Sequence, residues 1–393
     1  MTDGSPTSPL RILEVAALPF PSRQGTQVAL DSMCRGLAER GHEIHLLAYA
    51  HGAFHVNAPY EIHRLPDSPR FRSLRSGPDW RRALLDLRLA AEVRRLAGAL
   101  RPDVVHLHNV EAAAATLLLT FRPAPRCVYH AHNLMEHELP AYGTIGPRAL
   151  TGRLGRFLDA SLPARADLTI AISRSTRDGL VRAGADPARV RVVEPGADLE
   201  DLAGGPVPQP GAPPDTPEGF RVAYLGNLDR YQGVDRILDA LALLRRRGLP
   251  AELVAISDSA PGSLSRRAGT LGLPARFVPH GTLADAISAL RGCRVAALGR
   301  TVPGGFPMKL LVLLAARVPV AAVRTAVDGL DVDTAVVAAR DDTPEALAEA
   351  LQAAAGDAGR ADRVAAGLRL ARERFSRSAA AARLETVLHE ARV

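Results

Sequence analysis

The feature that most constrains the fold of this chain is an alternation of short apolar runs with longer amphipathic stretches. Examples of the runs are RILEVAAL from Arg11, EIHLLAY from Glu43 and DVVHLH from Asp103. Between the first two, residues 26–40 carry apolar side chains at helical spacing, and Gly41 follows as a stop. Buried strands that alternate with helices predict parallel β-α-β units, and therefore doubly wound sheets.

The alternation breaks once, at the Pro- and Gly-rich stretch LAGGPVPQPGAPPDTPEG, and then resumes. A single hydrophobic core stops growing at roughly 250–300 residues, so two domains are expected. We expect an N-terminal α/β domain over residues 1–203, a linker over 204–219, a second α/β domain of the same design over 220–376, and a C-terminal helix over 377–393 that packs back on the first domain.

The amino-acid composition limits which partners the protein can bind and in which compartment we expect it. The net charge of +7 favours anionic partners, but the arginines are spread along the chain without a nucleic-acid-binding motif, so no nucleic acid is expected. Cys34, Cys127 and Cys293 are far apart among apolar residues, which predicts buried free thiols. We see no signal peptide at the N-terminus and no run of about 18 apolar residues, so the cytoplasm is the expected compartment.

Ligands of open parallel sheets bind beyond the carboxyl ends of the strands, so the loops there are the candidate sites. The first is FPSRQGTQVAL, in which Gly25 and Thr26 open a helix. Free N–H groups and the helix dipole favour an anion at that place. The loop lacks the GxGxxG pattern of dinucleotide sites. A simple strand-to-helix turn with a threonine cap is the alternative.

Two histidine pairs follow strands, His106 with His108 and His130 with His132. Alternation along a strand puts both members of a pair on one face. Such histidines can contact a substrate hydroxyl, act as acid or base, bind a metal as in a metallohydrolase, or serve the structure alone. We find no clean carboxylate or cysteine set to complete a metal site, and basic surroundings disfavour a cation, so no metal is expected.

Two further loops lie in the second half. YLGNLDRYQGVDRIL presents Asn227, Arg230 and Gln232 as donors for a diphosphate, although it can equally be an ordinary strand-to-helix loop. TVPGGFPMKLLVLLAARVPV places Lys309, the only lysine of the chain, just after a Gly-Gly turn at a helix start. A cation there is favourable when an anion is also bound, and lysine suits phosphate. A solvent-facing lysine is the alternative.

Taken together, these segments resemble glycosyltransferase family 4, the retaining nucleotide-sugar-dependent enzymes with the GT-B fold. The similar segments are LAERGHEIHLLAY, the EPGAD turn with Pro195, Gly196 and Asp198, YLGNLDRYQGVDRIL and FPMKLLVLLAARVPVAAV. The resemblance implies two doubly wound Rossmann-like domains that face each other across a cleft. It also implies transfer of a sugar from a nucleoside diphosphate to an acceptor hydroxyl of a glycan, glycolipid or small molecule, with retention and without a bound cofactor or metal.

The resemblance also implies residue roles. His132 would contact the transferred sugar, at its 6-hydroxyl, and shape the electrostatics around the reacting carbon. His108, Asn109 and Asn133 would lie on the acceptor side. The residues expected at the donor are Gly25, Thr26, Asn227, Arg230, Gln232, His280, Gly304, Gly305, Phe306, Met308 and Lys309.

The sequence departs from the family pattern at several positions. Asn227 and Gln232 stand where the family has arginine and lysine. Gly304 and Val312 stand at the two glutamates of the family's Glu-x7-Glu motif, and Arg317 stands where a glycine is usual. Two interpretations follow: an enzyme with altered donor contacts, or a catalytically weakened scaffold that partners an active glycosyltransferase.

A basic stretch that contains Trp80 predicts a helix with leucines on roughly one face. Either this face packs into the core, or it rests on an anionic membrane, which would suit a lipid-linked acceptor at the inner face of the membrane. The leucines concerned are Leu85, Leu89, Leu96 and Leu100.

Overall fold

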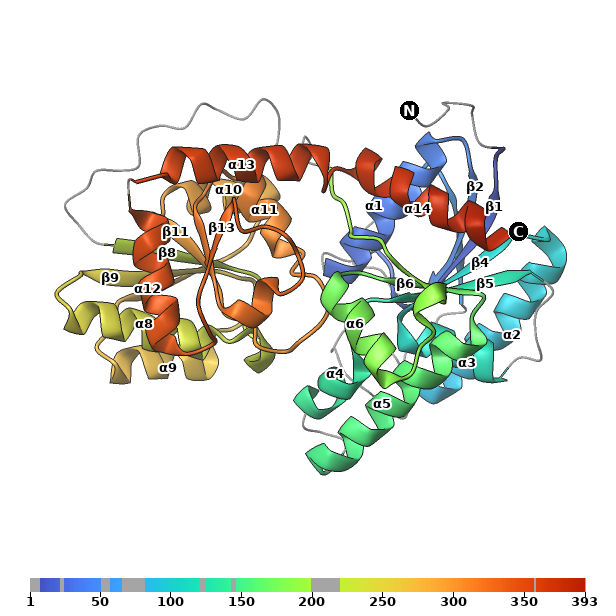
Figure 1. The fold of residues 1–393 in the computed structure, drawn as a ribbon, viewed down its shortest axis with the longest axis horizontal. Helices are drawn as coiled ribbons and strands as arrows, with labels where there is room; N and C mark the ends of the chain where they lie inside the picture. The colour runs from blue at the N-terminus through green and yellow to red at the C-terminus, as the bar shows by residue number, and fades with distance from the viewer. Residues whose placement is uncertain are drawn as a thin grey trace. The chain divides into compact units, whose positions relative to one another are not determined.

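The computed structural model of the protein describes residues 8–21, 25–50, 57–65, 82–119, 125–142, 146–198, 220–356 and 358–392. The expected linker 204–219 and Trp80 lie outside these residues. The chain divides into two compact units, and each is described by itself (Figure 1). The first comprises Met1–Gly196, Gly304–Phe306 and Arg377–Val393, and the second comprises Ala197–Pro303 and Pro307–Ser376.

The first unit is built on a parallel sheet of seven strands in the order β3-β2-β1-β4-β5-β6-β7. The strands are β1 Arg11–Pro19, β2 Glu43–Tyr49, β3 Glu61–Arg64, β4 Val104–His108, β5 Arg126–Ala131, β6 Leu168–Ala171 and β7 Val190–Val192. The helices are α1 Gly25–Glu39, α2 Arg82–Leu100, α3 Asn109–Leu119, α4 Met135–Tyr142, α5 Arg148–Arg165, α6 Arg174–Ala183 and α14 Arg377–Arg392, with a 3-10 turn, η2, at Pro187–Arg189.

The strands of this sheet are buried on both faces, which is why they read as nearly continuous apolar runs. Along β1, Leu13 and Val15 join one core cluster, whereas Ile12 and Ala16 join another. The first cluster includes residues of α2 and α3, and the second includes residues of α1 and α14. The period of two along the strand therefore divides its side chains between two helical layers.

The C-terminal helix α14 packs closely on α1 (Figure 1). A Cβ added to Gly36 would lie 2.7 Å from Cβ of Ala381, so only glycine permits this approach. Charged side chains flank the contact: Arg377 lies 2.9 Å from Glu39, and Arg40 pairs with Glu385. The small residue and the ion pairs together attach α14 to the first unit.

The second unit repeats the design with a six-stranded parallel sheet in the order β10-β9-β8-β11-β12-β13. The strands are β8 Phe220–Leu225, β9 Ala251–Ile256, β10 Ala275–Val278, β11 Val295–Leu298, β12 Val320–Ala322 and β13 Val336–Ala338. The helices are α8 Val234–Arg246, α9 Gly262–Thr270, α10 Leu283–Arg291, α11 Lys309–Ala315, α12 Pro344–Ala355 and α13 Arg360–Glu373, with 3-10 turns η3 at Arg230–Gln232 and η4 at Arg324–Val327.

In both sheets the strand order reverses beside the first strand, between β1 and β4 and between β8 and β11. Such a reversal is the topological switch point of a doubly wound sheet. The two doubly wound parallel sheets predicted from the sequence are thereby confirmed.

Three smaller expectations have clear outcomes. The three cysteines are free and buried, as predicted. The apolar face of α2 packs into the core: Leu85, Leu89 and Leu96 are buried there, and Leu100 packs against it. Of the two interpretations of this face, packing into the core is therefore confirmed and contact with lipid is wrong, because the core already covers the leucines. In the part of the chain that the structure describes, no helix is long and apolar enough to cross a membrane.

The helix expected from Pro307 begins two residues later, at Lys309, although the carbonyl of Pro307 accepts the N–H of Leu310 at 2.7 Å. After it, Arg317 takes the left-handed conformation, with φ +60°. This conformation costs a residue with a Cβ about 1–2 kcal/mol relative to right-handed backbone. The position suits glycine, the residue that the resemblance to family 4 implies there.

Replacement Arg317→Gly is expected to raise the free energy of unfolding by about 1 kcal/mol, because relief of the strain exceeds the added flexibility of glycine. Urea unfolding followed by circular dichroism measures the change. Arg317→Ala is the matched control, because it removes the charge near Arg291 and keeps the strained φ. An equal gain in both variants would show that charge, and not backbone strain, is responsible.

Candidate functional site

Four histidines gather at the carboxyl ends of β4 and β5 in the first unit. The strands are neighbours, and His108 pairs in register with His130. The ring centroids of His106 and His108 lie 4.3 Å apart, and those of His130 and His132 lie 4.5 Å apart. Both pairs therefore share one face, as the alternation predicted, and all four side chains are buried.

A carboxylate that the sequence reasoning missed lies beside these rings. Glu14 is on β1, the neighbour of β4, and is fully buried. Its Oε2 atom lies 2.6 Å from Nε2 of His108 and 2.8 Å from Nδ1 of His106. The signal in the sequence is a single acid inside the apolar run RILEVAAL, since a charge in a buried strand requires a partner.

The rings extend this contact into a chain of short distances. Nδ1 of His108 lies 3.1 Å from Nε2 of His132, and Nε2 of His106 lies 3.2 Å from Nδ1 of His130. The carboxylate of Glu14 is thus the centre of two arms, each made of two imidazoles. His132, the predicted sugar contact, is the end of one arm.

The electrostatics of the cluster favour one charge at its centre. Burial acts to raise the pKa of Glu14, but His106 and His108 outweigh burial and lower it to about 2. Burial, together with the neighbouring His106, lowers the pKa of His108. Burial and the neighbouring rings lower the pKa values of His130 and His132 well below the usual range. Glu14 is therefore ionised at neutral pH, and these three imidazoles are neutral.

Ring nitrogens of His106, His108 and His130 lie within 4.8 Å of one another, close enough to consider a metal ion. Two further groups in the described residues meet the same criterion, His42 with Glu385 and His389, and His45 with Glu61 and His63. In the first group, Nδ1 of His106 and Nε2 of His108 already lie 2.8 Å and 2.6 Å from Glu14, whereas Nε2 of His130 has no hydrogen-bond partner within the described residues. An ion there would have to replace these contacts, so the arrangement fits a hydrogen-bonded chain better than a metal centre.

The other predicted residues of the first sheet lie at the same edge. Gly25 and Thr26 form the first turn of α1, where Gly25 is exposed and Thr26 is half-buried; residues 22–24 of this loop lie outside the description. Asn109 follows His108 directly and takes φ +68°, and the half-buried Asn133 follows His132. A left-handed non-glycine residue beside a strand end is a frequent mark of a functional site.

Gly304, Gly305 and Phe306 group with the first unit rather than the second. The N–H of Gly305 donates to Oγ1 of Thr176 at 3.0 Å, and both glycines have φ +78°. A Cβ on Gly304 would approach Leu134 at 3.0 Å. The Gly-Gly turn was expected to face the donor. Instead, Gly304 packs against the side chain of Leu134, and the N–H of Gly305 already donates to Thr176.

Lys309 lies at the switch point of the second sheet. Its Nζ donates to Oε1 of Gln232 at 2.7 Å and to the hydroxyl of Tyr224 at 3.0 Å, and it lies 4.4 Å from the centre of the Tyr224 ring. The Lys309 residue is half-buried, and its ammonium group is hydrogen-bonded to two side chains of the second unit. Burial, assisted by Arg300, lowers the pKa of Lys309 to about 7.

The loops after β8 and β11 approach each other very closely here. Gly233 has φ +70°, and a Cβ on it would lie 1.9 Å from the carbonyl oxygen of Gly299. This approach brings Gln232, on the first loop, within reach of Lys309, which follows the second. Asn227 and Arg230 lie on the same loop as Gln232 and are exposed, and Met308 is half-buried beside Lys309.

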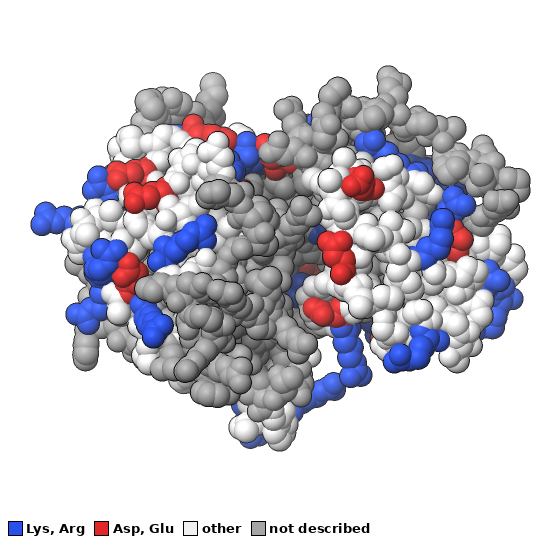
Figure 2. Space-filling view, turned by 180° about the vertical axis from the view of Figure 1, so that it is seen from behind, with Lys and Arg blue, Asp and Glu red and all other residues white. Residues whose placement is uncertain are grey.

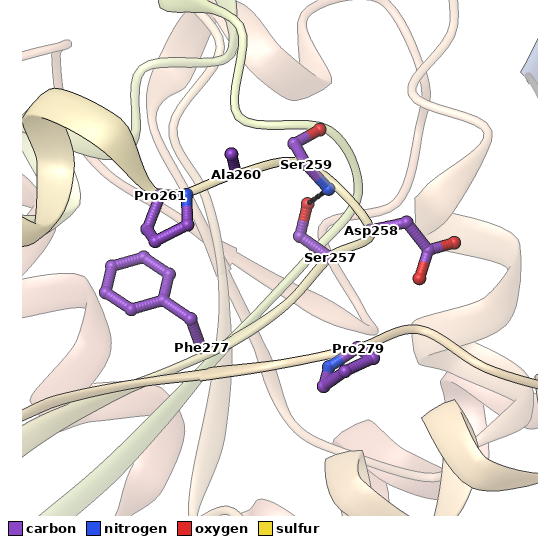
Figure 3. Close-up of a pocket in the computed structure, with 7 residues that line it drawn as sticks. All are labelled: Ser257, Asp258, Ser259, Ala260, Pro261, Phe277 and Pro279. Carbon is purple, nitrogen blue, oxygen red and sulfur yellow. Dashed lines mark hydrogen bonds between the residues drawn. The ribbon is translucent and has the colours of Figure 1, made fainter.

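A shallow, open pocket of about 380 Å³ lies at the carboxyl ends of β9 and β10, and it is called the β9–β10 cavity below. Its lining was missed by the sequence reasoning, which singled out His280 alone in this region. In Figure 3, Phe277 and Pro261 lie together at one end and Asp258 points away from them. The N–H of His280 donates to Oδ1 of Asp258 at 2.8 Å. The lining residues are Ser257, Asp258, Ser259, Ala260, Pro261, Phe277 and Pro279.

Comparison with known proteins agrees with this geometry. Residues 23–201 match the family described as Glycosyltransferase Family 4, and residues 219–357 match the family described as Glycosyl transferases group 1. No curated protein sequence matches the chain.

Solved structures of glycosyltransferases share the fold along nearly the whole chain. HepE of Anabaena, in complex with UDP and glucose, is 18% identical with a TM-score of 0.70, covering 97% of this chain and 99% of its own. Sucrose-phosphate synthase of Thermosynechococcus elongatus is 16% identical with a TM-score of 0.74, covering 97% and 98%. The catalytic domain of starch synthase IV from Arabidopsis thaliana, bound to ADP and acarbose, is 13% identical with a TM-score of 0.71, covering 98% and 100%.

Replacement Gly233→Ala is expected to lower the free energy of unfolding by about 3 kcal/mol or more, because the new methyl group collides with a backbone carbonyl. Urea unfolding measures the loss. Gly248→Ala is the matched control, since Gly248 has φ +85° and no atom within 4 Å of an added Cβ. Similar losses in the two variants would mean that positive φ alone matters and that the close approach of the loops does not.

Proposed function

Because the chain is a family 4-like glycosyltransferase with the GT-B fold, we propose that it transfers a sugar, with retention, from a nucleoside diphosphate to a hydroxyl of a glycan or glycolipid. The proposal that a nucleoside diphosphate binds to the second unit rests on one observation. The ammonium group of Lys309 lies at the switch point of the second sheet and is hydrogen-bonded to Gln232 and Tyr224. Ligands of doubly wound sheets bind at such points. Among the described residues in Figure 2, basic and acidic side chains are both present and interspersed.

The diphosphate of the donor would bind beside Lys309. The present partners of its ammonium, Gln232 and Tyr224, are neutral, so they compensate its charge only in part. A bound diphosphate would raise the pKa of Lys309 again and hold the ammonium form. Charge that develops on the departing diphosphate during transfer would be stabilised by the same ammonium. Asn227 and Arg230 are exposed nearby as further donors.

The nucleoside would lie toward the cavity at β9 and β10. The ring of Phe277 offers an apolar surface for a base, and the carboxylate of Asp258 can accept hydrogen bonds from a base or ribose. HepE was crystallised with UDP and starch synthase IV with ADP, so either base is a reasonable first donor to test.

On the first unit, His132 would contact the transferred sugar, with His108, Asn109 and Asn133 toward the acceptor and Gly25 and Thr26 toward the phosphates. These roles are supported by position, because all six residues lie at or just beyond the carboxyl ends of strands in the first sheet.

A lipid-linked acceptor is supported by an exposed face of α5. Leu150, Leu154 and Phe157 follow one another at helical spacing and are 63%, 48% and 61% exposed. Arg148 and Arg153 are exposed on the same helix, whose single acid, Asp159, is buried. Apolar side chains flanked by arginine suit the surface of an anionic bilayer. We propose this face, in place of α2, as the site of peripheral membrane contact.

Replacement Lys309→Ala is expected to weaken the binding of UDP or ADP at least about tenfold, because a charge-assisted hydrogen bond to phosphate is lost. Thermal shift against UDP, GDP, ADP and dTDP sugars identifies the nucleotide, and calorimetry then gives its affinity. Arg246→Ala, an exposed charge at the end of α8, is the matched control. Equal affinity in both variants would refute the phosphate role of Lys309. Retained binding without turnover of any donor would favour the scaffold alternative.

Replacement of Leu154 and Phe157 together by glutamine is expected to abolish sedimentation of the protein with vesicles that contain phosphatidylglycerol, because the apolar anchors are lost. Leu87→Gln on α2 is the matched control, since Leu87 is 53% exposed but lies outside this face. Binding that does not depend on the anionic lipid, or that survives the double replacement, would refute the assignment.

A further inference from the structure

We propose that Glu14 is a positioning residue for the sugar site: through His108 it fixes the tautomer of His132, with the proton on Nε2 and Nδ1 left as an acceptor for a sugar hydroxyl. The contact with sugar rests on the proposed function. The control of the tautomer by Glu14 rests on the geometry of the first unit alone.

The first step is the contact between Glu14 and His108. The carboxylate is fully buried, and its Oε2 atom lies 2.6 Å from Nε2 of His108. Its other oxygen, Oε1, has no hydrogen-bond partner within the described residues. An ionised carboxylate accepts hydrogen bonds and cannot donate. Nε2 of His108 must therefore carry the proton of this hydrogen bond.

The second step passes from His108 to His132. A neutral imidazole has one N–H, so Nδ1 of His108 is left as an acceptor. The atom 3.1 Å from it is Nε2 of His132, which must then be the donor. Because the His132 ring is also neutral, its Nδ1 has no proton.

Burial supports the neutral state of both rings. His108 is fully buried and His132 is 5% exposed, and burial lowers the pKa of each. A second ring lies close to the same oxygen of Glu14: Nδ1 of His106 is 2.8 Å from Oε2. The His132 ring is also stacked on His130, with 15° between the ring planes, so its orientation is fixed together with its tautomer.

A bare Nδ1 can accept a hydrogen bond from a hydroxyl of the transferred sugar but can donate none. Replacement Glu14→Gln gives position 14 an amide that can donate to His108 instead. The amide can therefore hold His108 in either tautomer, and when its NH2 donates, the direction of the chain reverses: His108 donates from Nδ1 to Nε2 of His132, and His132 carries its proton on Nδ1. Glu14→Asp keeps an acceptor-only carboxylate and therefore the original direction.

Nitrogen NMR of histidine-labelled protein tests the tautomers directly. Signals are assigned by loss in His132→Asn and His108→Asn, and His280→Ala in the second unit is the control that removes its own signals only. We expect both rings as Nε2–H tautomers in the unmodified protein, and we expect Nδ1–H tautomers to appear in Glu14→Gln, in which the carboxylate no longer fixes the direction. An Nδ1–H or doubly protonated His132 in the unmodified protein overturns the proposal, whether or not the variant folds. Unchanged tautomers in a folded Glu14→Gln variant overturn it as well.

Kinetics test the contact with sugar separately. With UDP-glucose and its 6-deoxy analogue as probes, the unmodified protein and Glu14→Asp should prefer the donor with the hydroxyl. In Glu14→Gln, the ratio of kcat/KM for UDP-glucose to kcat/KM for the 6-deoxy analogue should fall about fivefold, which is the effect of one hydrogen bond. A purely structural role of Glu14 would lower turnover of both donors equally and leave the preference unchanged, which would contradict the proposed contact. Absence of turnover of every UDP, GDP, ADP and dTDP sugar in the unmodified protein would count against the proposed function, and the NMR result would still decide the tautomer.

Discussion

The structure of both units depends on the adjacency of the first and fourth strands of each sheet. At this point the winding of the chain reverses, so the connections on either side leave toward opposite faces of the sheet. The backbone of the two loops must then come close without a side chain between them, as Gly233 and Gly299 do. The same adjacency brings Glu14 on β1 against His108 on β4, and Gln232 after β8 against Lys309.

Each switch point encloses one charge, and the two are compensated differently. In the first unit, Glu14 has imidazoles on one of its oxygens, and their contacts lower its pKa despite complete burial. In the second unit, Lys309 has a phenol and an amide oxygen as hydrogen-bond partners, and its pKa falls to about 7. The protein itself thus supplies the partners of the Oε2 atom of this carboxylate. The ammonium has neutral partners, which is the arrangement expected of a site whose counter-charge arrives with the ligand.

Much of the fold could be predicted from the sequence because parallel strands buried on both faces leave an unmistakable apolar run, and because glycines and prolines mark the breaks. The histidine pairs were predictable for the same reason, since alternation alone places them on one face. Glu14 was missed because its meaning depends on which strand lies beside β1, which local periodicity does not contain. The partners of Lys309 also come from the order of the strands. The β9–β10 cavity could not be predicted, because its lining consists of loop residues without a sequence pattern. The apolar face of α5 could not be predicted either, because the sequence does not show which apolar side chains stay exposed outside the core.

The single lysine has a chemical consequence. Amine-reactive reagents modify the neutral amine of a lysine and not its ammonium form. At neutral pH an ordinary lysine is almost entirely in the ammonium form. Lys309 has a pKa of about 7, and no second lysine competes with it anywhere in the chain. Acylation at neutral pH would therefore label one side chain, at the switch point, apart from the chain's own amino terminus. The extent of labelling would report whether that ammonium is enclosed by protein, open to solvent or covered by a bound phosphate.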